Sequence, residues 1–136
     1  MDVEVNREGS ILTAKGRRGK AILDTTNKKV VRITYVGVAH GEFVPVLGEE
    51  LSKVGRHPIT MILDASEMAT YETSFRKGWV EWLEAHEPER VLILFRSRIV
   101  SMGVAMTNAV IRGNMEPYSN RDDFEAAASR LLSEAN

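Results

Sequence analysis

Side chains that can take part in chemistry gather in three short stretches of this 136-residue sequence, each close to an apolar run. They are Asp64 with Ser66, Thr73 with Ser74 and Arg76, and Arg96 with Ser97 and Arg98. A carboxylate can act as a base, a metal ligand or a phosphoacceptor. A hydroxyl can carry a phosphoryl group, and two guanidinium groups can hold an anion. These residues form the candidate site, and the surrounding pattern predicts the elements that position them.

Asp64 has two interpretations. In the first, its carboxylate accepts hydrogen bonds from backbone N–H groups of the loop that follows the apolar run 59–63. In the second, it is a base, a metal ligand or a phosphoacceptor like that of a response-regulator receiver. Receiver chemistry needs further acids to bind Mg²⁺ near the first strand, and a lysine after a later strand. The early strands lack paired acids and Arg96 follows the later run, so the pattern favours the first interpretation.

Arg96 and Arg98 also have two interpretations. They can hold an anion at a helix N-terminus, or they are solvated or paired with glutamates while Ser97 caps the helix. No glycine-rich loop lies nearby, so we expect no nucleotide or other cofactor. We also expect no metal site, because His40, His57 and His86 lack the spacing of metal ligands and the chain has no cysteine.

Apolar periodicity predicts the elements around these residues. We expect strands at 10–15, 20–24, 30–38, 59–63, 91–95 and 115–118, and helices at 41–54, 71–86, 99–112 and 120–135. The third helix is expected to turn Ile99, Met102, Met106, Ala109 and Val110 inward. Strands separated by one helix should be parallel neighbours. The fold class is therefore α/β: an N-terminal β-meander followed by αβαβαβα, with a mixed sheet covered by helices.

Length and charge set further expectations. We expect one domain over 1–136, with 1–29 as an N-terminal β-hairpin extension and 30–132 as the core. A net charge of −1 disfavours nucleic-acid binding, and the basic residues near the predicted hairpin tip are not interleaved with aromatics. No apolar run approaches the roughly 20 residues that span a bilayer, so we expect no membrane insertion. The absence of cysteine fits a cytoplasmic location.

The order of elements and the stretch 62–74 resemble the STAS domain of bacterial anti-sigma factor antagonists. In that family an apolar strand ends in Asp-x-Ser, as in Asp64-Ala65-Ser66, and Asp-Ser-Ser-Gly or Asp-Ser-Thr-Gly follows at the start of a helix. Glu72-Thr73-Ser74 falls on these positions, so the resemblance assigns the phosphorylated hydroxyl to Ser74. In the family, the glycine at the next position lets a partner kinase approach closely. Here Phe75 stands in place of that glycine.

The resemblance implies a non-enzymatic regulatory domain that binds a protein partner, such as a kinase-type regulator. Binding would use the helix that begins near Tyr71 and the loop after Asp64, and phosphorylation of Ser74 or Thr73 would switch it. The same hypothesis includes a site for a partner or an anion, formed by Asp64, Ser66, Arg76 and the 96–98 stretch.

Other interpretations stay open. The chain can be a small-ligand or lipid-binding domain of this fold, with a pocket lined by Phe95, Met102 and Met106. It can also be an enzyme in which Asp64 works with Arg96 or Arg98. The apolar helix 99–111 and the strand near 117 permit a homodimer.

Overall fold

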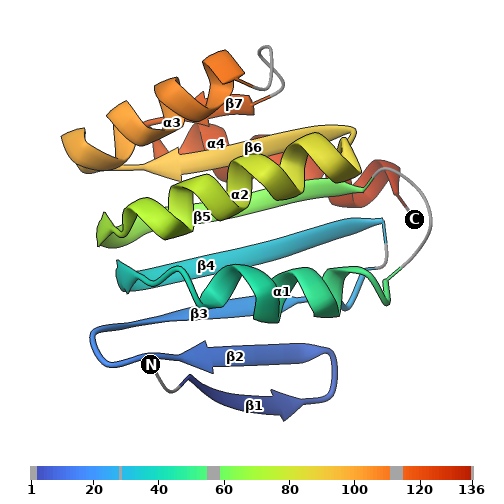
Figure 1. Ribbon diagram of the computed structural model, residues 1–136. Helices are drawn as coiled ribbons and strands as arrows, with labels where there is room; N and C mark the ends of the chain where they lie inside the picture. The colour runs from blue at the N-terminus through green and yellow to red at the C-terminus, as the bar shows by residue number, and fades with distance from the viewer. Residues whose placement is uncertain (1–2, 28, 55–58, 111–114, 136) are drawn as a thin grey trace.

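The computed structural model describes residues 3–27, 29–54, 59–110 and 115–135 (Figure 1). In these residues seven strands form one sheet, in chain order: β1 (Glu4–Glu8), β2 (Ile11–Lys15), β3 (Gly19–Asp24), β4 (Val30–Ala39), β5 (Thr60–Tyr71), β6 (Arg90–Phe95) and β7 (Met115–Tyr118). The helices are α1 (Phe43–Leu51), α2 (Thr73–His86), α3 (Arg98–Val110) and α4 (Arg121–Glu134). Strands β1 to β4 pair antiparallel and β4 to β7 pair parallel, as the predicted meander and crossovers require.

Helices cover the sheet unequally (Figure 1). Helices α1, α2 and α3 pack on one face, over a core that includes Tyr35, Phe43, Met61 and Trp79. Helix α4 packs on the other face, where a second core holds Ile62, Leu92, Leu94, Phe124 and Leu131. Successive residues of a strand point to opposite faces. Central strands covered on both faces therefore need apolar residues throughout, which explains the two continuous runs in the sequence.

The two central strands are parallel neighbours, as predicted. Leu63 of β5 lies opposite Ile93 of β6 in the parallel register. Strand β1, by contrast, was not predicted, because all of its residues but Val5 are polar and all five are exposed. Its backbone pairs with β2, and Arg7 donates to both carboxylate oxygens of Glu50 on α1 at 2.7 and 2.6 Å. These contacts attach an edge strand that carries no apolar pattern.

Strand β5 is longer than predicted. The sequence analysis ended it at residue 63 and began the next helix at Tyr71, but the strand continues through Thr70 and Tyr71. Its second half pairs with β4, up to Ala39 opposite Tyr71, across two register shifts. Backbone pairing with a neighbour can hold a polar segment extended, so local composition did not reveal it. Asp64 consequently lies within a strand and not at its end.

The inward face of α3 was also predicted incorrectly. Ile99, Met102 and Met106 are 53%, 59% and 49% exposed, whereas Val100 and Val104 are buried. The side chains of the remaining two residues expected to face inward, at 109 and 110, lie outside the described residues. This helix carries apolar residues on all of its faces, so the periodicity of the sequence could not identify the face that packs on the sheet.

Candidate functional site

Asp64 is buried on the α4 side of the sheet, with 7% of its surface exposed. Its Oδ1 accepts hydrogen bonds from the Ser66 backbone N–H at 3.1 Å and from the Ser66 hydroxyl at 2.6 Å. Its Oδ2 lies 3.3 Å from the guanidinium of Arg121 and 3.7 Å from that of Arg32. Both carboxylate oxygens therefore already have polar partners.

The contacts of Asp64 belong to a network that joins β4, β5 and α4. Arg32 donates to both carboxylate oxygens of Glu125 at 2.9 and 3.0 Å, and Arg121 donates to the Ser66 hydroxyl at 2.7 Å. Burial alone would raise the pKa of Asp64. The hydrogen bonds from Ser66 and the charge of Arg121 outweigh burial and hold that pKa below its ordinary value. The carboxylate is thus an ionised anchor between layers.

Arg96 and Ser97 lie between β6 and α3, and Arg98 is the first residue of α3; among the described residues none of the three makes a hydrogen bond or ion pair with this network. The Ser97 hydroxyl accepts the Val100 backbone N–H at 3.3 Å and caps α3, as one interpretation expected. Arg96 and Arg98 are exposed, and neither has an ion pair within the described residues. The guanidinium partners of Asp64 are Arg32 and Arg121, and the described residues show no ion pair between Asp64 and Arg96 or Arg98, on which the enzyme alternative depended.

Thr73 and Ser74 are the first two residues of α2, and both are exposed. Phe75 turns into the core, where it is 7% exposed and its ring lies 5.2 Å from that of Tyr35. The bulky residue at the position of the family's glycine therefore does not cover Ser74. Ser74 packs closely against Gly41. A Cβ atom added to Gly41 would clash with the Ser74 hydroxyl oxygen.

An apolar cavity of about 60 Å³ lies between α2, α3 and the sheet. Its walls include the aromatic rings of Tyr35, Tyr71 and Trp79, and Arg76 contributes its half-buried side chain. Phe95, Met102 and Met106 do not line it, because the buried face of α3 is the one that carries Val100, Gly103, Val104 and Thr107. The residues predicted to line a pocket were therefore wrong.

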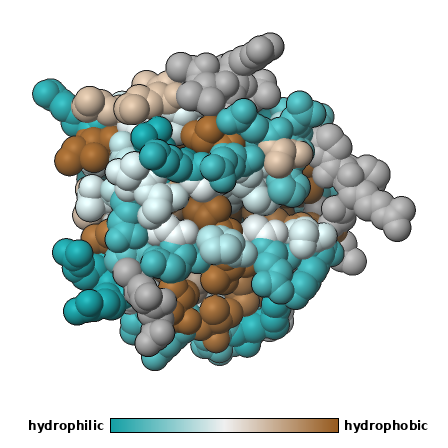
Figure 2. Space-filling view, viewed as in Figure 1, coloured by the Kyte–Doolittle hydropathy of each residue, from teal (hydrophilic) through white to brown (hydrophobic). Residues whose placement is uncertain are grey.

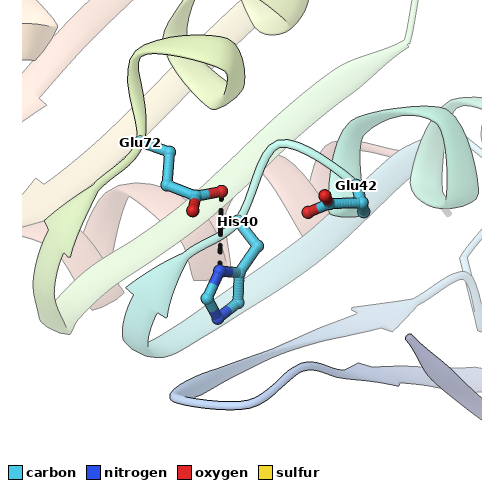
Figure 3. A group of neighbouring side chains, drawn as sticks. All are labelled: His40, Glu42 and Glu72. Carbon is cyan, nitrogen blue, oxygen red and sulfur yellow. Dashed lines mark ion pairs between the residues drawn. The ribbon is translucent and has the colours of Figure 1, made fainter. Parts of the chain in front are cut away.

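The junction of β4 and α1 brings together residues that sequence reasoning did not connect: His40, Glu42 and Glu72 (Figure 3). The His40 Nε2 accepts the Arg18 backbone N–H at 3.3 Å, and its Nδ1 lies 3.5 Å from Oε1 of Glu72. The backbone N–H of Gly41 donates to the same Glu72 oxygen at 2.8 Å, which lowers the pKa of Glu72 despite partial burial. The His-x-Glu spacing at 40–42 was the only local signal.

The outward face of α3 is apolar. Ile99, Met102 and Met106 are three of the large hydrophobic side chains that the described residues leave exposed. In Figure 2 apolar colours appear over α3 at the upper left, bordered by hydrophilic side chains. Among the described residues, no helix has the length and apolar character needed to cross a membrane.

Comparisons with known proteins bear on the fold. No protein-family model and no curated protein matches the sequence. Solved structures do match. One is an uncharacterised protein of the DUF3478 family with a SpoIIAA-like fold from Shewanella loihica PV-4, 13% identical, at a TM-score of 0.54 over 93% of this chain and 92% of that one.

Two further matches are anti-sigma factor antagonists. One comes from Mycobacterium paratuberculosis and is 14% identical, with a TM-score of 0.56 over 82% of this chain and 94% of that one. The other is SpoIIAA in its unphosphorylated form, 17% identical, with a TM-score of 0.54 over 79% and 95% of the two chains. At these identities the likeness concerns architecture. The chain therefore adopts the SpoIIAA-like fold, as its resemblance to STAS domains predicted.

Proposed function

We propose that this chain is a non-enzymatic regulatory domain that binds a protein partner over the start of α2 and the outward face of α3. The docking surface consists of Thr73 and Ser74 on α2 and of Ile99, Met102 and Met106 on α3. Both helices follow parallel strands, so they begin at the same edge of the sheet (Figure 1). The observation that carries the proposal is the exposed apolar stripe on α3, a helix that begins at the same edge of the sheet as the exposed hydroxyls of α2. Contiguous exposed apolar surface is typical of interaction sites.

Phosphorylation of Ser74 would switch this surface. A phosphate adds about −1.5 to −2 charges, and the unpaired N–H groups of the first helical turn favour a negative group there. The modification would therefore be accommodated within the chain while it changes the charge that a partner meets. The inward turn of Phe75 supports access to Ser74. The likeness to anti-sigma factor antagonists supports a regulatory role.

Partner capture with matched variants tests this proposal. Wild type, Ser74→Asp and Met102→Ser would be used to capture proteins from a native lysate that contains ATP, and the bound proteins compared. Ser133→Asp is the matched control, because Ser133 is an exposed serine on α4, on the other face of the sheet. We expect Ser74→Asp and Met102→Ser to lose partners that Ser133→Asp keeps.

The same lysate tests the switch directly. Mass spectrometry should find phosphate on Ser74 or Thr73, and Ser74→Ala should remove the Ser74 signal. If no phosphate appears and all four proteins capture the same partners, the docking surface is wrongly assigned. Self-association, detected by light scattering and abolished in Met102→Ser, would instead identify a second copy of the chain as the occupant.

The cavity favours a second candidate function, the binding of a small apolar ligand. Its walls are almost entirely apolar, which suits an apolar ligand. Native mass spectrometry of freshly purified protein should then show bound mass. Val104→Phe would fill the cavity and abolish this mass, whereas Ala105→Phe on the exposed side of α3 would not. A clean spectrum, with no thermal shift across a lipid and metabolite panel, would eliminate this candidate.

A further inference from the structure

We propose that His40, Glu42 and Glu72 bind a divalent transition-metal ion, for which zinc is the best-fitting probe. One ligand atom from each residue lies within 4.8 Å of the other two. His40 and Glu42 flank the glycine at the end of β4, and Glu72 is the residue before α2 (Figure 3). The site thus joins two helix starts that are separated by about thirty residues of sequence.

Two buried polar atoms in this cluster make no hydrogen bond of ordinary length. His40 is 1% exposed, and its Nδ1 has only a long 3.5 Å approach to Glu72 Oε1, beyond the ordinary range of a hydrogen bond, while the buried Oε2 of Glu42 has no partner. Buried polar atoms in native proteins are nearly always paired, so each exception needs a physical explanation. A cation between them would provide a partner for both atoms.

The spacing suits a small cation. Two ligands of a tetrahedral zinc ion, each about 2.0–2.1 Å from the metal, lie roughly 3.3 Å apart. The His40 Nδ1 and Glu72 Oε1 are already 3.5 Å apart, and the Gly41 N–H holds this Glu72 oxygen in place. Glu42 is the third ligand of the proposed set, since one of its carboxylate oxygens lies within 4.8 Å of the ligand atoms of the other two. The Glu72 side chain is 37% exposed, which leaves a path for the ion and for a water ligand.

The donor set selects the class of metal. Mg²⁺ and Ca²⁺ prefer oxygen ligands alone, whereas one imidazole with two carboxylates suits zinc or manganese. The two carboxylate charges balance the ion. Arg18 is the other charged group that acts on Glu72, so its positive charge weakens binding without removing a ligand.

Metal binding has a consequence for the His40 imidazole. In the metal-free chain Nε2 accepts the Arg18 N–H, so the proton of the neutral ring is on Nδ1. Ligation through Nδ1 requires the proton to move to Nε2, where it faces the Arg18 N–H. The ion must therefore break this 3.3 Å hydrogen bond, which is longer than most N–H hydrogen bonds. Zinc should shift the Arg18 amide together with the tautomer.

Calorimetric titration of the whole, untagged, EDTA-treated chain tests the site. We expect one zinc ion per chain, weaker manganese binding and no magnesium binding. Glu42→Gln and Glu72→Gln should each weaken zinc binding by at least about tenfold, because loss of a ligand should exceed the effect of losing a supporting contact. Glu84→Gln and His86→Gln, at exposed positions of α2, are matched controls and should bind like wild type.

A second measurement separates this site from adventitious binding. Nitrogen-15 NMR should show His40 protonated at Nδ1 without metal and at Nε2 with zinc, with a shifted Arg18 amide. If Glu72→Gln does not fold, Glu42→Gln alone decides the titration. Absence of zinc binding, binding unchanged in Glu42→Gln, or a His40 ring still protonated at Nδ1 at saturating zinc would each overturn the proposal.

Discussion

Replacement of Asp64 by asparagine tests whether this carboxylate is an anchor. Asparagine has nearly the same shape, and its carbonyl oxygen can still accept the two Ser66 hydrogen bonds. Its NH₂ group, however, would take the place of Oδ2 and face the guanidinium donors of Arg121 and Arg32. The variant therefore replaces an attraction between charges with two opposed donors in a buried position.

The expected cost follows from exposure. The Arg121 side chain is 51% exposed, so we assign its ion pair no more than about 1 kcal/mol after solvent screening. An unpaired buried amide donor costs about 1–3 kcal/mol, and the Ser66 hydrogen bonds weaken when the acceptor loses its charge. We expect a loss of about 2 kcal/mol in the free energy of unfolding, or roughly 8 °C in Tm for a chain of this size.

Urea denaturation at several pH values is the assay. The pKa of Asp64 is lowered on folding, so its stabilisation is present above its unfolded pKa, near 3.9. That stabilisation is lost as the pH falls through the lower folded pKa. The difference in the free energy of unfolding between wild type and Asp64→Asn should therefore be largest at pH 7 and become smaller below about pH 4. Asp122→Asn, at an exposed position of α4, is the control and should cost less than about 1 kcal/mol.

Two outcomes would contradict this reasoning. Asp64→Asn could match wild type within about 0.5 kcal/mol at pH 7, which is the range of surface substitutions. Alternatively, the gap could stay constant down to pH 2, in which case the ionised state of the carboxylate would not be its source. Either result would reopen a chemical role for Asp64.

Three further substitutions test the packing and the docking surface. Tyr35→Phe removes the acceptor of the buried Trp79 indole N–H, now 2.9 Å away, and should cost about 1–3 kcal/mol by urea denaturation; no loss would mean that the indole finds another partner. Gly37→Ala should cost at least about 1 kcal/mol by the same assay, because φ is +77° and a Cβ would clash with the Arg18 carbonyl oxygen; unchanged stability would contradict the strain. Met102→Ser should change the free energy of unfolding by less than about 0.5 kcal/mol, since the side chain is 59% exposed, and a larger loss would show that α3 needs it for folding.

Continuous apolar runs and helical stripes were enough to predict the central architecture. The run that became β6 needed cover on both faces, and a single intervening helix required a parallel neighbour. The cap at Ser97 and the buried stripe of Phe75, Trp79 and Leu83 on α2 were likewise readable. Helix caps and buried stripes depend on residues that are only a few positions apart in the chain. The local sequence is therefore enough to predict them.

The contacts of the candidate site depended on tertiary structure. Asp64 meets Arg121 because α4 crosses the back of the sheet, and His40 meets Glu72 because two helix starts share one edge. The outward face of α3 was decided by which side packs against the sheet, since both sides are apolar. Such pairings follow from how distant elements pack. A periodic pattern determines which face of a strand or helix is buried, but it does not specify the partner that covers that face.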